Sequence, residues 1–412
     1  MKIGIISFEE ALNSKTLRGV FTTTRYLQKD LQSTGLDVDL LVYGKNKLDY
    51  PKGFDIVRHC QSLEDLRELK STYDFIIYFT PGRSWEKFDE NDPDKYIDVI
   101  DAVGLPFTTI YHSEEYKTHQ PYRMNFISHK DCKFITFITE GFKDIYEDDL
   151  KICNDYAVAL MLPPLNPLSY ILSKEKTDSV IITSAWTNFK RNMDYFELAG
   201  DFTGLGIKPY SAGAPSSNFY LNDIMDYLVD RVELSINPML KADELSLSRY
   251  FDYATMMARL KQDVPYSKKE KDSIPYVGGA IIHTKSGHCW YDYGAYYPEQ
   301  MVSILEDKKF HWNMSCYKVN KAYIPRLEIV TVEALNEGCL PVICQETTPD
   351  WITDDSAIRL SKKDYAEHID VLKDMSEDER KSRITKFYEL VKSNLYDGVY
   401  DAIRDKIMEV VE

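Results

Sequence analysis

The sequence predicts an α/β protein made of two doubly wound domains, and three observations predict it. The chain has 412 residues, which is more than one hydrophobic core usually serves. Short β-rich runs alternate with helical stretches along most of its length, and this alternation indicates parallel sheets covered by helices on both faces. A proline-rich stretch at 160–179 then interrupts the pattern and turns polar, as interdomain linkers do.

The first half of the chain is expected to form a Rossmann-like N-terminal domain, residues 1–170. Apolar runs predict strands at 2–8, 36–43, 54–59, 74–82, 106–115 and 132–140. Helices are expected at 19–35, 61–70, 93–102 and 141–150. The loop after the first strand, FEEALNSKTLRG, has a single glycine, so it lacks the dinucleotide fingerprint of a Rossmann oxidoreductase.

The second half repeats the alternation and predicts a second Rossmann-like domain, residues 171–395. Strands are expected at 179–185, 278–284, 309–316 and 339–345, and helices at 188–200, 243–261, 297–307 and 327–337. The tail predicts two helices broken near Asp397 and Gly398, and residues 396–412 are expected to pack back on the N-terminal domain. Two such domains that face each other hold their ligand in the cleft between them, beyond the carboxyl ends of the strands.

Composition excludes several classes of protein. With 66 acidic against 50 basic residues the net charge is −16, which predicts solubility and no broad affinity for polyanions, so a nucleic acid would need a local basic patch. Seven cysteines without CxxC spacing predict thiols in a reducing compartment and no zinc site. No signal-peptide core and no long apolar stretch is present, so a cytoplasmic location without membrane spans is expected.

Two glutamates, Glu328 and Glu333, lie inside the apolar stretch RLEIVTVEALNEGCLPVI, just ahead of a predicted buried strand. Residues five apart on a helix differ by about 140° around its axis, so the two acids do not share a narrow stripe. Glu328 is therefore expected at the start of the helix, where a diphosphate can dock, and Glu333 one turn further, where it can accept hydrogen bonds from ribose hydroxyls. The alternative is that Glu328 caps the helix and Glu333 faces solvent.

Lys190 and Arg191 lie in TSAWTNFKRNMDYF, where the first strand of the second domain is expected to give way to a helix. Cations at this point of an α/β sheet can hold a leaving phosphate. The alternative is a basic pair on a solvated surface. Trp186 and Phe189 are expected in the core or in the wall of the cleft.

His112 and Glu114 lie in YHSEEYKTHQPYRMN, at the carboxyl end of a predicted strand. They alternate onto one side of an extended chain. A carboxylate there can act as a general base or stabilise a cationic sugar centre. The alternative is an ordinary solvated loop.

Three further stretches have a functional and a structural interpretation each. DENDPDKYID, residues 89–98, imitates an Asp-x-Asp metal motif, but its proline and its acidity favour a helix start. The aromatic stretch 287–300 can stack a sugar or a base, and packing inside the fold is the alternative. The basic stretch 266–273 can contact nucleic acid or form a surface loop.

Together these stretches resemble retaining glycosyltransferases of the GT-B fold, and within them the phage DNA hydroxymethylcytosine glycosyltransferases. TNFKRNMDYFEL, residues 187–198, resembles the segment that opens the second domain of the phage enzymes, with Lys190 at the position of their phosphate-binding lysine. The run 318–343 matches in pattern: Asn, Tyr, Arg326, two glutamates five apart, then Gly338 and Pro341 three apart. Residues 37–47 and 110–125 match more loosely.

The resemblance implies two Rossmann-like domains, with a UDP-sugar donor held mainly by the second and the acceptor by the first. It implies that Lys190, Arg191 and Arg326 bind the diphosphate, that Glu328 lies beside the diphosphate or sugar, and that Glu333 holds the ribose. Glu114, with His112, takes the place of a catalytic acid, and Lys190 also acts in catalysis. No metal or other cofactor is implied, the anomeric configuration is retained, and the expected acceptor is hydroxymethylated cytosine in DNA.

Two departures from the phage pattern affect the acceptor and the sugar. The phage enzymes place a histidine directly before their catalytic Asp, whereas Ser113 precedes Glu114 here and His112 lies one residue earlier. Their arginine upstream of the lysine is Ala185 here, and Arg191 is the expected substitute. Glucose and arabinose both stay open as the transferred sugar. A glycan or lipid acceptor, and a non-catalytic protein that binds nucleotide sugars, are the alternative functions.

Overall fold

The chain of the computed structural model falls into two units, each with its own sheet. Unit 1 consists of Met1–Pro164 and Ser393–Glu412, and unit 2 of Leu165–Lys392. The N-terminal unit thus includes the last residues of the chain. The structure describes residues 1–8, 19–44, 56–79, 95–111, 120–184, 192–213, 229–235, 279–293, 301–316, 318–319, 322–323 and 326–412.

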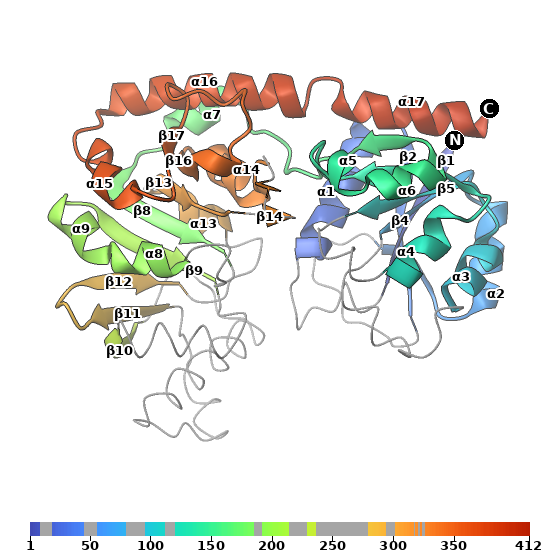
Figure 1. The fold of residues 1–412 in the computed structure, drawn as a ribbon, viewed down its shortest axis with the longest axis horizontal. Coiled ribbons are helices and arrows are strands. Elements are labelled where there is room, and N and C mark those ends of the chain that lie inside the picture. Colours follow the sequence, from blue (N-terminus) through green and yellow to red (C-terminus); the bar gives the residue numbers. More distant parts are fainter. Residues whose placement is uncertain are drawn as a thin grey trace. The chain divides into compact units, whose positions relative to one another are not determined.

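Unit 1 is built on a sheet of seven described strands, all paired in parallel (Figure 1). The strands are β1 Lys2–Phe8, β2 Asp37–Tyr43, β3 Ile56–Cys60, β4 Phe75–Phe79, β5 Phe107–Tyr111, β6 Cys132–Phe137 and β7 Tyr156–Val158. Their order is β3-β2-β1-β4-β5-β6-β7, so the winding reverses between β1 and β4. Every residue of β4 and β5 is buried, as expected for strands of a parallel sheet that is covered on both faces, and β4 is accordingly a continuous apolar run, FIIYF.

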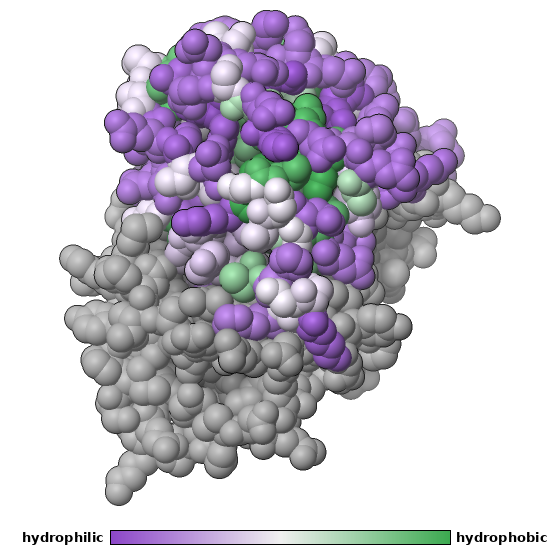
Figure 2. Space-filling model, turned by 90° about the vertical axis from the view of Figure 1, so that its left-hand side faces the viewer, coloured by the Kyte–Doolittle hydropathy of each residue, from purple (hydrophilic) through white to green (hydrophobic). Residues whose placement is uncertain are grey.

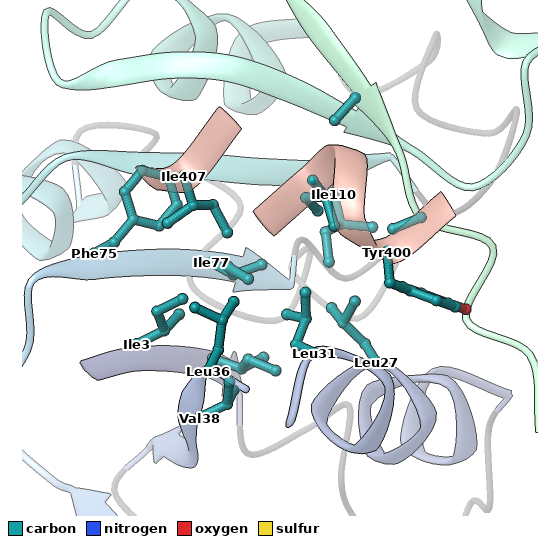
Figure 3. Close-up of a cluster of buried hydrophobic side chains, with 14 of the residues drawn as sticks. Ile3, Leu27, Leu31, Leu36, Val38, Phe75, Ile77, Ile110, Tyr400 and Ile407 are labelled. Carbon is teal, nitrogen blue, oxygen red and sulfur yellow. The ribbon is translucent and has the colours of Figure 1, made fainter. Parts of the chain in front are cut away.

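Helices cover both faces of this sheet. They are α1 Gly19–Ser33, α2 Leu63–Arg67, the 3₁₀ helix η3 Glu68–Ser71, α3 Lys95–Val103, α4 Gln120–Ile127, α5 Phe142–Ile145, α6 Glu147–Cys153 and α17 Val399–Val411. On one face, Leu27 and Leu31 of α1 and Ile403 and Ile407 of α17 pack against the strands in one buried cluster (Figure 3). The opposite face is covered by side chains of α2, α3 and α4. The last helix of the chain therefore completes the core of the N-terminal unit.

Unit 2 has a mixed sheet of eight described strands in the order β10-β11-β12-β9-β8-β13-β16-β17. The strands are β8 Thr177–Thr183, β9 Lys208–Ala212, β10 Val229–Ser235, β11 Gly279–Thr284, β12 Cys289–Asp292, β13 Lys308–Asn313, β16 Leu340–Cys344 and β17 Ile358–Leu360. The strands from β12 to β17 in this order pair in parallel, whereas β10, β11 and β12 pair antiparallel. A separate antiparallel pair joins β14 Lys318–Val319 to β15 Ala322–Tyr323.

The described helices of unit 2 are mostly short. They are α7 Leu168–Ser173, α8 Asn192–Glu197, α9 Ala199–Gly204, α13 Met301–Leu305, α14 Ile329–Asn336, α15 Tyr365–His368, the 3₁₀ helices η8 Gln345–Thr347 and η9 Ile369–Leu372, and α16 Glu377–Leu395, which ends in unit 1. Gly338 ends the turn after α14 with a φ of +78°, and a β-carbon there would lie 2.6 Å from the carbonyl oxygen of Ile171. Only glycine fits this left-handed, crowded position, so Gly338 fixes how α14 turns into β16.

The predicted fold class is confirmed, and most predicted strands and helices are present within a few residues of their expected ends. The linker prediction at 160–179 is wrong in its second half, because α7 and the start of β8 occupy it and Ile171 of α7 is fully buried. The helix α4 and the strands β7, β9, β10, β12, β14, β15 and β17 were not predicted, and most of these strands have five residues or fewer. The helix expected at 243–261 lies outside the described residues.

The described surface of unit 2 is mainly hydrophilic where it faces the viewer in Figure 2, with apolar residues gathered near its middle. The aromatic stretch after residue 287 contributes to the interior, because Trp290 is fully buried and stacks on Phe196 with ring centroids 4.5 Å apart. The packing interpretation therefore holds for Trp290. Among the described residues, no helix has both the length and the apolar character that crossing a membrane requires.

Candidate functional site

A pocket lies in unit 2 where β13 and β16 end, beside the first turn of α14. The two strands end together, since Asn313 of β13 pairs with Ile343 of β16. The pocket is a shallow hollow that opens to solvent. It is lined by Asn313, Ser315, Arg326, Leu327, Glu328, Ile343, Cys344, Thr347, Thr348 and Pro349.

An arginine and a glutamate form the charged part of this pocket. Arg326 donates from Nε and Nη2 to the same oxygen of Glu328, Oε1, at 3.1 and 2.9 Å. Both side chains are largely buried, with 16% and 12% of their surfaces exposed. The pair places a guanidinium and a carboxylate side by side at the pocket wall.

Glu328 occupies the N-cap position of α14, and its backbone is extended there with φ −73° and ψ 143°. Its carboxylate makes no hydrogen bond to the N–H groups of the first turn, although the backbone carbonyl accepts one from the N–H of Thr331 at 2.9 Å. The side chain therefore does not cap the helix, which was the structural alternative for this residue. It points instead to Arg326.

Hydrogen bonds between neighbouring elements hold the charged pair in place. The backbone N–H of Arg326 donates to the carbonyl of Thr347 in η8 at 3.0 Å. The amide of Asn313 donates to Thr331 Oγ1 of α14 at 2.7 Å, and its oxygen accepts from the Ser315 hydroxyl at 2.7 Å. The end of β13, the start of α14 and the segment after β16 are thus tied together around the pocket.

Cys344, Thr347 and Thr348 also line the pocket, and Cys316 lies beside Cys344. Thr347 Oγ1 donates to the carbonyl of Ser315 at 2.7 Å, and Thr348 Oγ1 donates to the carbonyl of Cys344 at 2.6 Å. The sulfur atoms of Cys316 and Cys344 lie 2.8 Å apart. The hydrogen bond with Cys316, burial, and a hydrogen bond to Glu346 together raise the pKa of the Cys344 thiol.

This arrangement suits a ligand that carries both phosphate and hydroxyl groups. The guanidinium of Arg326 and the positive end of the α14 dipole attract an anion. The carboxylate of Glu328 and the neutral side chains of Asn313, Ser315 and the threonines offer partners for hydroxyl groups. Among the described residues no group of three or more His, Cys, Asp or Glu side chains is arranged to hold a metal ion.

The predicted site residues are only partly described by the structure. Arg326 and Glu328 are brought together in the pocket, and Glu333 lies in the second turn of α14, partly buried and outside the described pocket lining. His112, Glu114, Lys190 and Arg191 lie outside the described residues. The strand that precedes Lys190 in the sequence, β8, pairs in parallel with β13, so the chain leaves β8 at the sheet edge that holds the pocket.

Sequence reasoning missed the neutral residues of the pocket. Asn313 and Ser315 lie in the second half of the predicted strand 309–316, and Thr347 and Thr348 come just after the predicted strand 339–345. The rule that ligands bind beyond the carboxyl ends of parallel strands would have selected both segments. No signal in the sequence joined the two cysteines, which are 28 positions apart.

Comparisons with known proteins add evidence on the fold. No family model matches the sequence, and no curated protein matches it. Among solved structures, the chain is similar to the T4 phage alpha-glucosyltransferase in complex with UDP-glucose and DNA containing an abasic site, with a TM-score of 0.64 over 99% of each chain at 14% identity. The same transferase was also solved with UDP alone.

Two bacterial transferases have similar structures at lower identity. A glycosyltransferase from Rickettsia africae has a TM-score of 0.58 at 10% identity, over 100% of this chain and 98% of its own. The pneumococcal O-GlcNAc transferase in complex with UDP and GlcNAc has a TM-score of 0.56 at 9% identity, over 100% and 99%. The chain therefore has the two-domain GT-B fold, and the predicted resemblance is confirmed at the level of the fold.

Proposed function

We propose that this protein is a retaining glycosyltransferase that moves glucose or arabinose from a UDP-sugar to hydroxymethylated cytosine in DNA. The observation that carries the proposal is the Arg326–Glu328 pair, held in a pocket at the start of α14 and the ends of two parallel strands. Solved proteins of the same fold carry UDP or UDP-glucose, which supports a nucleotide sugar as the ligand of such a pocket. In this proposal unit 2 binds the donor and unit 1 the acceptor.

Each donor-side residue has a separate role in the proposal. Arg326, Lys190 and Arg191 bind the diphosphate, because guanidinium and ammonium groups stabilise the charge that develops on a leaving phosphate. Glu328 contacts the sugar beside the diphosphate, and Glu333 accepts hydrogen bonds from the ribose hydroxyls. The cations and the N–H groups of α14 make a metal or other cofactor unnecessary in this scheme.

The proposed reaction exchanges one bond at the anomeric carbon. The bond from that carbon to the phosphate oxygen breaks, a bond to the acceptor oxygen forms on the same face, and the proton of the acceptor hydroxyl passes to the departing phosphate. The anomeric carbon carries positive charge in the transition state, and the carboxylate of Glu114, assisted by His112, stabilises that charge. Lys190 neutralises the phosphate as it leaves.

DNA is the proposed acceptor, although the net charge of the chain is −16. The support is that solved structures of the same fold include complexes with DNA, one of them containing an HMU base. A hydroxymethyl group inside a duplex has to leave the base stack to reach a transferase site. Binding is expected to depend strongly on salt, since phosphate contacts release counterions. The reaction is placed in the cytoplasm, that of the host if the protein is encoded by a phage.

A glycan or lipid acceptor is the second candidate. It is supported by the pneumococcal O-GlcNAc transferase of the same fold, solved in complex with UDP and GlcNAc, and by the acidic composition of this chain. A protein that binds nucleotide sugars without turning them over is the third. The three candidates can be told apart by what happens to the sugar of one donor: transfer to DNA, no transfer to DNA, or no turnover.

The test incubates the full chain with labelled UDP-glucose or UDP-arabinose and with duplexes that contain hydroxymethylcytosine or unmodified cytosine. Mass spectrometry of the digested DNA identifies the modified base and the sugar. Transfer only to hydroxymethylcytosine supports the proposal. Donor hydrolysis without transfer to DNA supports the second candidate, and donor binding without turnover supports the third.

Two variants test the residues proposed to bind the donor that are not part of the pocket lining. Lys190 lies outside the described residues, and Glu333 lies in α14 beyond the pocket. Lys190→Ala is expected to lower kcat/KM about 10²–10³-fold, the range for the loss of one charge contact in the transition state. Activity within about twofold of the wild type would remove Lys190 from the mechanism. Glu333→Ala is expected mainly to raise the KM for the donor, and an unchanged donor affinity contradicts its role at the ribose.

A further inference from the structure

A pair of thiols at the end of β13 and β16 is not used by the proposed reaction. The Sγ atoms of Cys316 and Cys344 lie 2.8 Å apart, closer than two sulfur atoms that merely pack against each other. Both residues are thiols in this structure. They are 28 positions apart in the sequence, so the fold rather than the local chain brings them together.

The backbone on both sides of this thiol pair is held by neighbouring threonines. Thr347 Oγ1 donates to the carbonyl of Ser315, the residue before Cys316. Thr348 Oγ1 donates to the carbonyl of Cys344 itself. A disulfide forms without backbone movement only where the fold already brings the two side chains together. The two hydroxyl contacts fix the backbone carbonyls beside this thiol pair.

The two thiols differ in access and in surroundings. Cys316 is partly exposed, whereas Cys344 is 1% exposed and donates from Sγ to Glu346 Oε2 at 3.1 Å. The carboxylate of Glu346 is kept in place by the Ser361 hydroxyl at 3.0 Å and by the backbone N–H of Lys362 at 3.2 Å. An oxidant from solvent therefore meets Cys316 first, and Cys344 lies behind it with a proton acceptor attached.

We propose that Cys316 and Cys344 are a modification site, at which a small external disulfide converts the two thiols into a reversible intramolecular disulfide. The Cys316 thiolate attacks the external disulfide, joins to one of its halves and releases the other as a thiol. The sulfur of Cys344 then attacks Cys316 Sγ, its proton passes by way of the Glu346 carboxylate to the departing half, and that half is released as a thiol. Two electrons and two protons leave the protein, and the oxidant becomes two thiols.

A second thiol pair in unit 1 provides a matched comparison. Cys132 and Cys153 have Sγ atoms 3.7 Å apart, an ordinary contact distance, and both are partly buried. We expect this pair to be oxidised more slowly than Cys316 and Cys344, because its sulfur atoms have to approach each other first. Changing both residues, in Cys132→Ser/Cys153→Ser, removes its contribution to the total thiol count.

The experiment treats the reduced full chain with oxidised glutathione, blocks the remaining thiols with an alkylating reagent, and maps peptides without reduction. The expected result is a peptide pair linked through Cys316 and Cys344, formed at least about threefold faster than any Cys132–Cys153 link and reversed by dithiothreitol. In Cys344→Ser, Cys316 is expected to retain one glutathione, because nothing resolves the mixed disulfide. In Cys316→Ser, the buried Cys344 is expected to retain none.

Several outcomes would overturn this modification site. One is a wild-type protein in which Cys316 carries glutathione and no link to Cys344 forms. Another is a wild-type protein in which Cys132 and Cys153 link first. Because the mapping uses the wild-type chain and needs no sugar donor, it gives its answer whether or not the proposed glycosyltransferase activity is found.

Discussion

Two buried carboxylates, one in each unit, have opposite surroundings. Glu328 of unit 2 faces the guanidinium of Arg326, two residues away, in a pocket that opens to solvent. Asp30 of unit 1 is 7% exposed and hydrogen-bonds the hydroxyl of Tyr400, and burial raises its pKa to about 7. The first acid is placed where a ligand can reach its charge, whereas the second joins α1 to α17 and its charge destabilises the fold. The comparison separates a binding site from a structural contact.

The largest effect is expected from Arg326→Ala, which removes the cation of the pocket. If the pair binds a diphosphate, kcat/KM with a UDP-sugar should fall about 10²–10³-fold, the range for one lost charge contact. Steady-state kinetics and UDP titration measure this. Arg326→Lys keeps the charge but loses the contact through two nitrogen atoms. Its kcat/KM should therefore lie between those of the wild type and Arg326→Ala.

The double variant Arg326→Ala/Glu328→Ala separates binding from stability. The single variant leaves a largely buried carboxylate without its guanidinium, which destabilises unit 2. The double variant should recover most of the lost free energy of unfolding but none of the lost UDP affinity. Recovery of both quantities would mean that the pair is structural, as Asp30 and Tyr400 are.

A substitution that creates a cavity in the core of unit 1 should destabilise the protein without changing its affinity for UDP. Ile407 of α17 is fully buried in the cluster that also contains Leu27 and Leu31 (Figure 3). Ile407→Ala should lower the free energy of unfolding by about 2–5 kcal/mol, measured by urea denaturation. UDP affinity should stay within about twofold of the wild type. A large loss of affinity would contradict the assignment of donor binding to unit 2 alone.

Asp30→Asn tests the other half of the comparison through pH. The pKa of Asp30 is about 7 in the folded protein, above the value of about 3.9 in the unfolded chain. At a pH between these two values, the folded protein keeps the proton of Asp30 and the unfolded chain has lost it. Stability should therefore fall as pH rises from about 4 to about 7. The Asn variant has no carboxyl to ionise, so at pH 8 it should be more stable than the wild type by about 4 kcal/mol, at about 1.4 kcal/mol for each unit of the pKa difference.

Urea denaturation at pH 4.5 and at pH 8 measures this difference. Near the lower pH the carboxyl is protonated in the folded wild type, so the two proteins should be close in stability. Glu328→Gln serves as the contrast, because it removes half of an ion pair and should not stabilise the protein at pH 8. A wild type whose stability does not change across this range would show that Asp30 is not buried as described.

The smallest effect is expected at the hydrogen bond that ties β13 to α14. Thr331→Val removes the hydroxyl that accepts from the Asn313 amide at 2.7 Å and should cost about 1 kcal/mol of stability. Thr331→Ser retains the hydroxyl and should cost less. If Asn313 positions the pocket wall, Thr331→Val should also weaken UDP binding several-fold, and Thr331→Ser should not.

The fold was predictable because its signals are local and repeated. Apolar runs such as FIIYF of β4 and the left-handed break at Gly398, with a φ of +77°, are decided by residues close in sequence. Short elements were missed for the same reason, since the three residues of β7 carry too little pattern of their own. The second half of the expected linker holds α7, in which Ile171 is fully buried and its carbonyl lies close to Gly338, a contact that the local sequence does not contain.

The sequence alone determined the two α/β domains, the position of Glu328 at a helix start and Arg326 as a candidate ligand-binding residue. These depend on spacing along one short segment, so local geometry is sufficient. Only the tertiary structure decided that Asn313, Thr331 and Thr347 frame the pocket, that Asp30 meets Tyr400, and that Cys316 meets Cys344. Contacts between residues so far apart depend on how strands and helices pack, and packing is a property of the whole domain rather than of any one stretch.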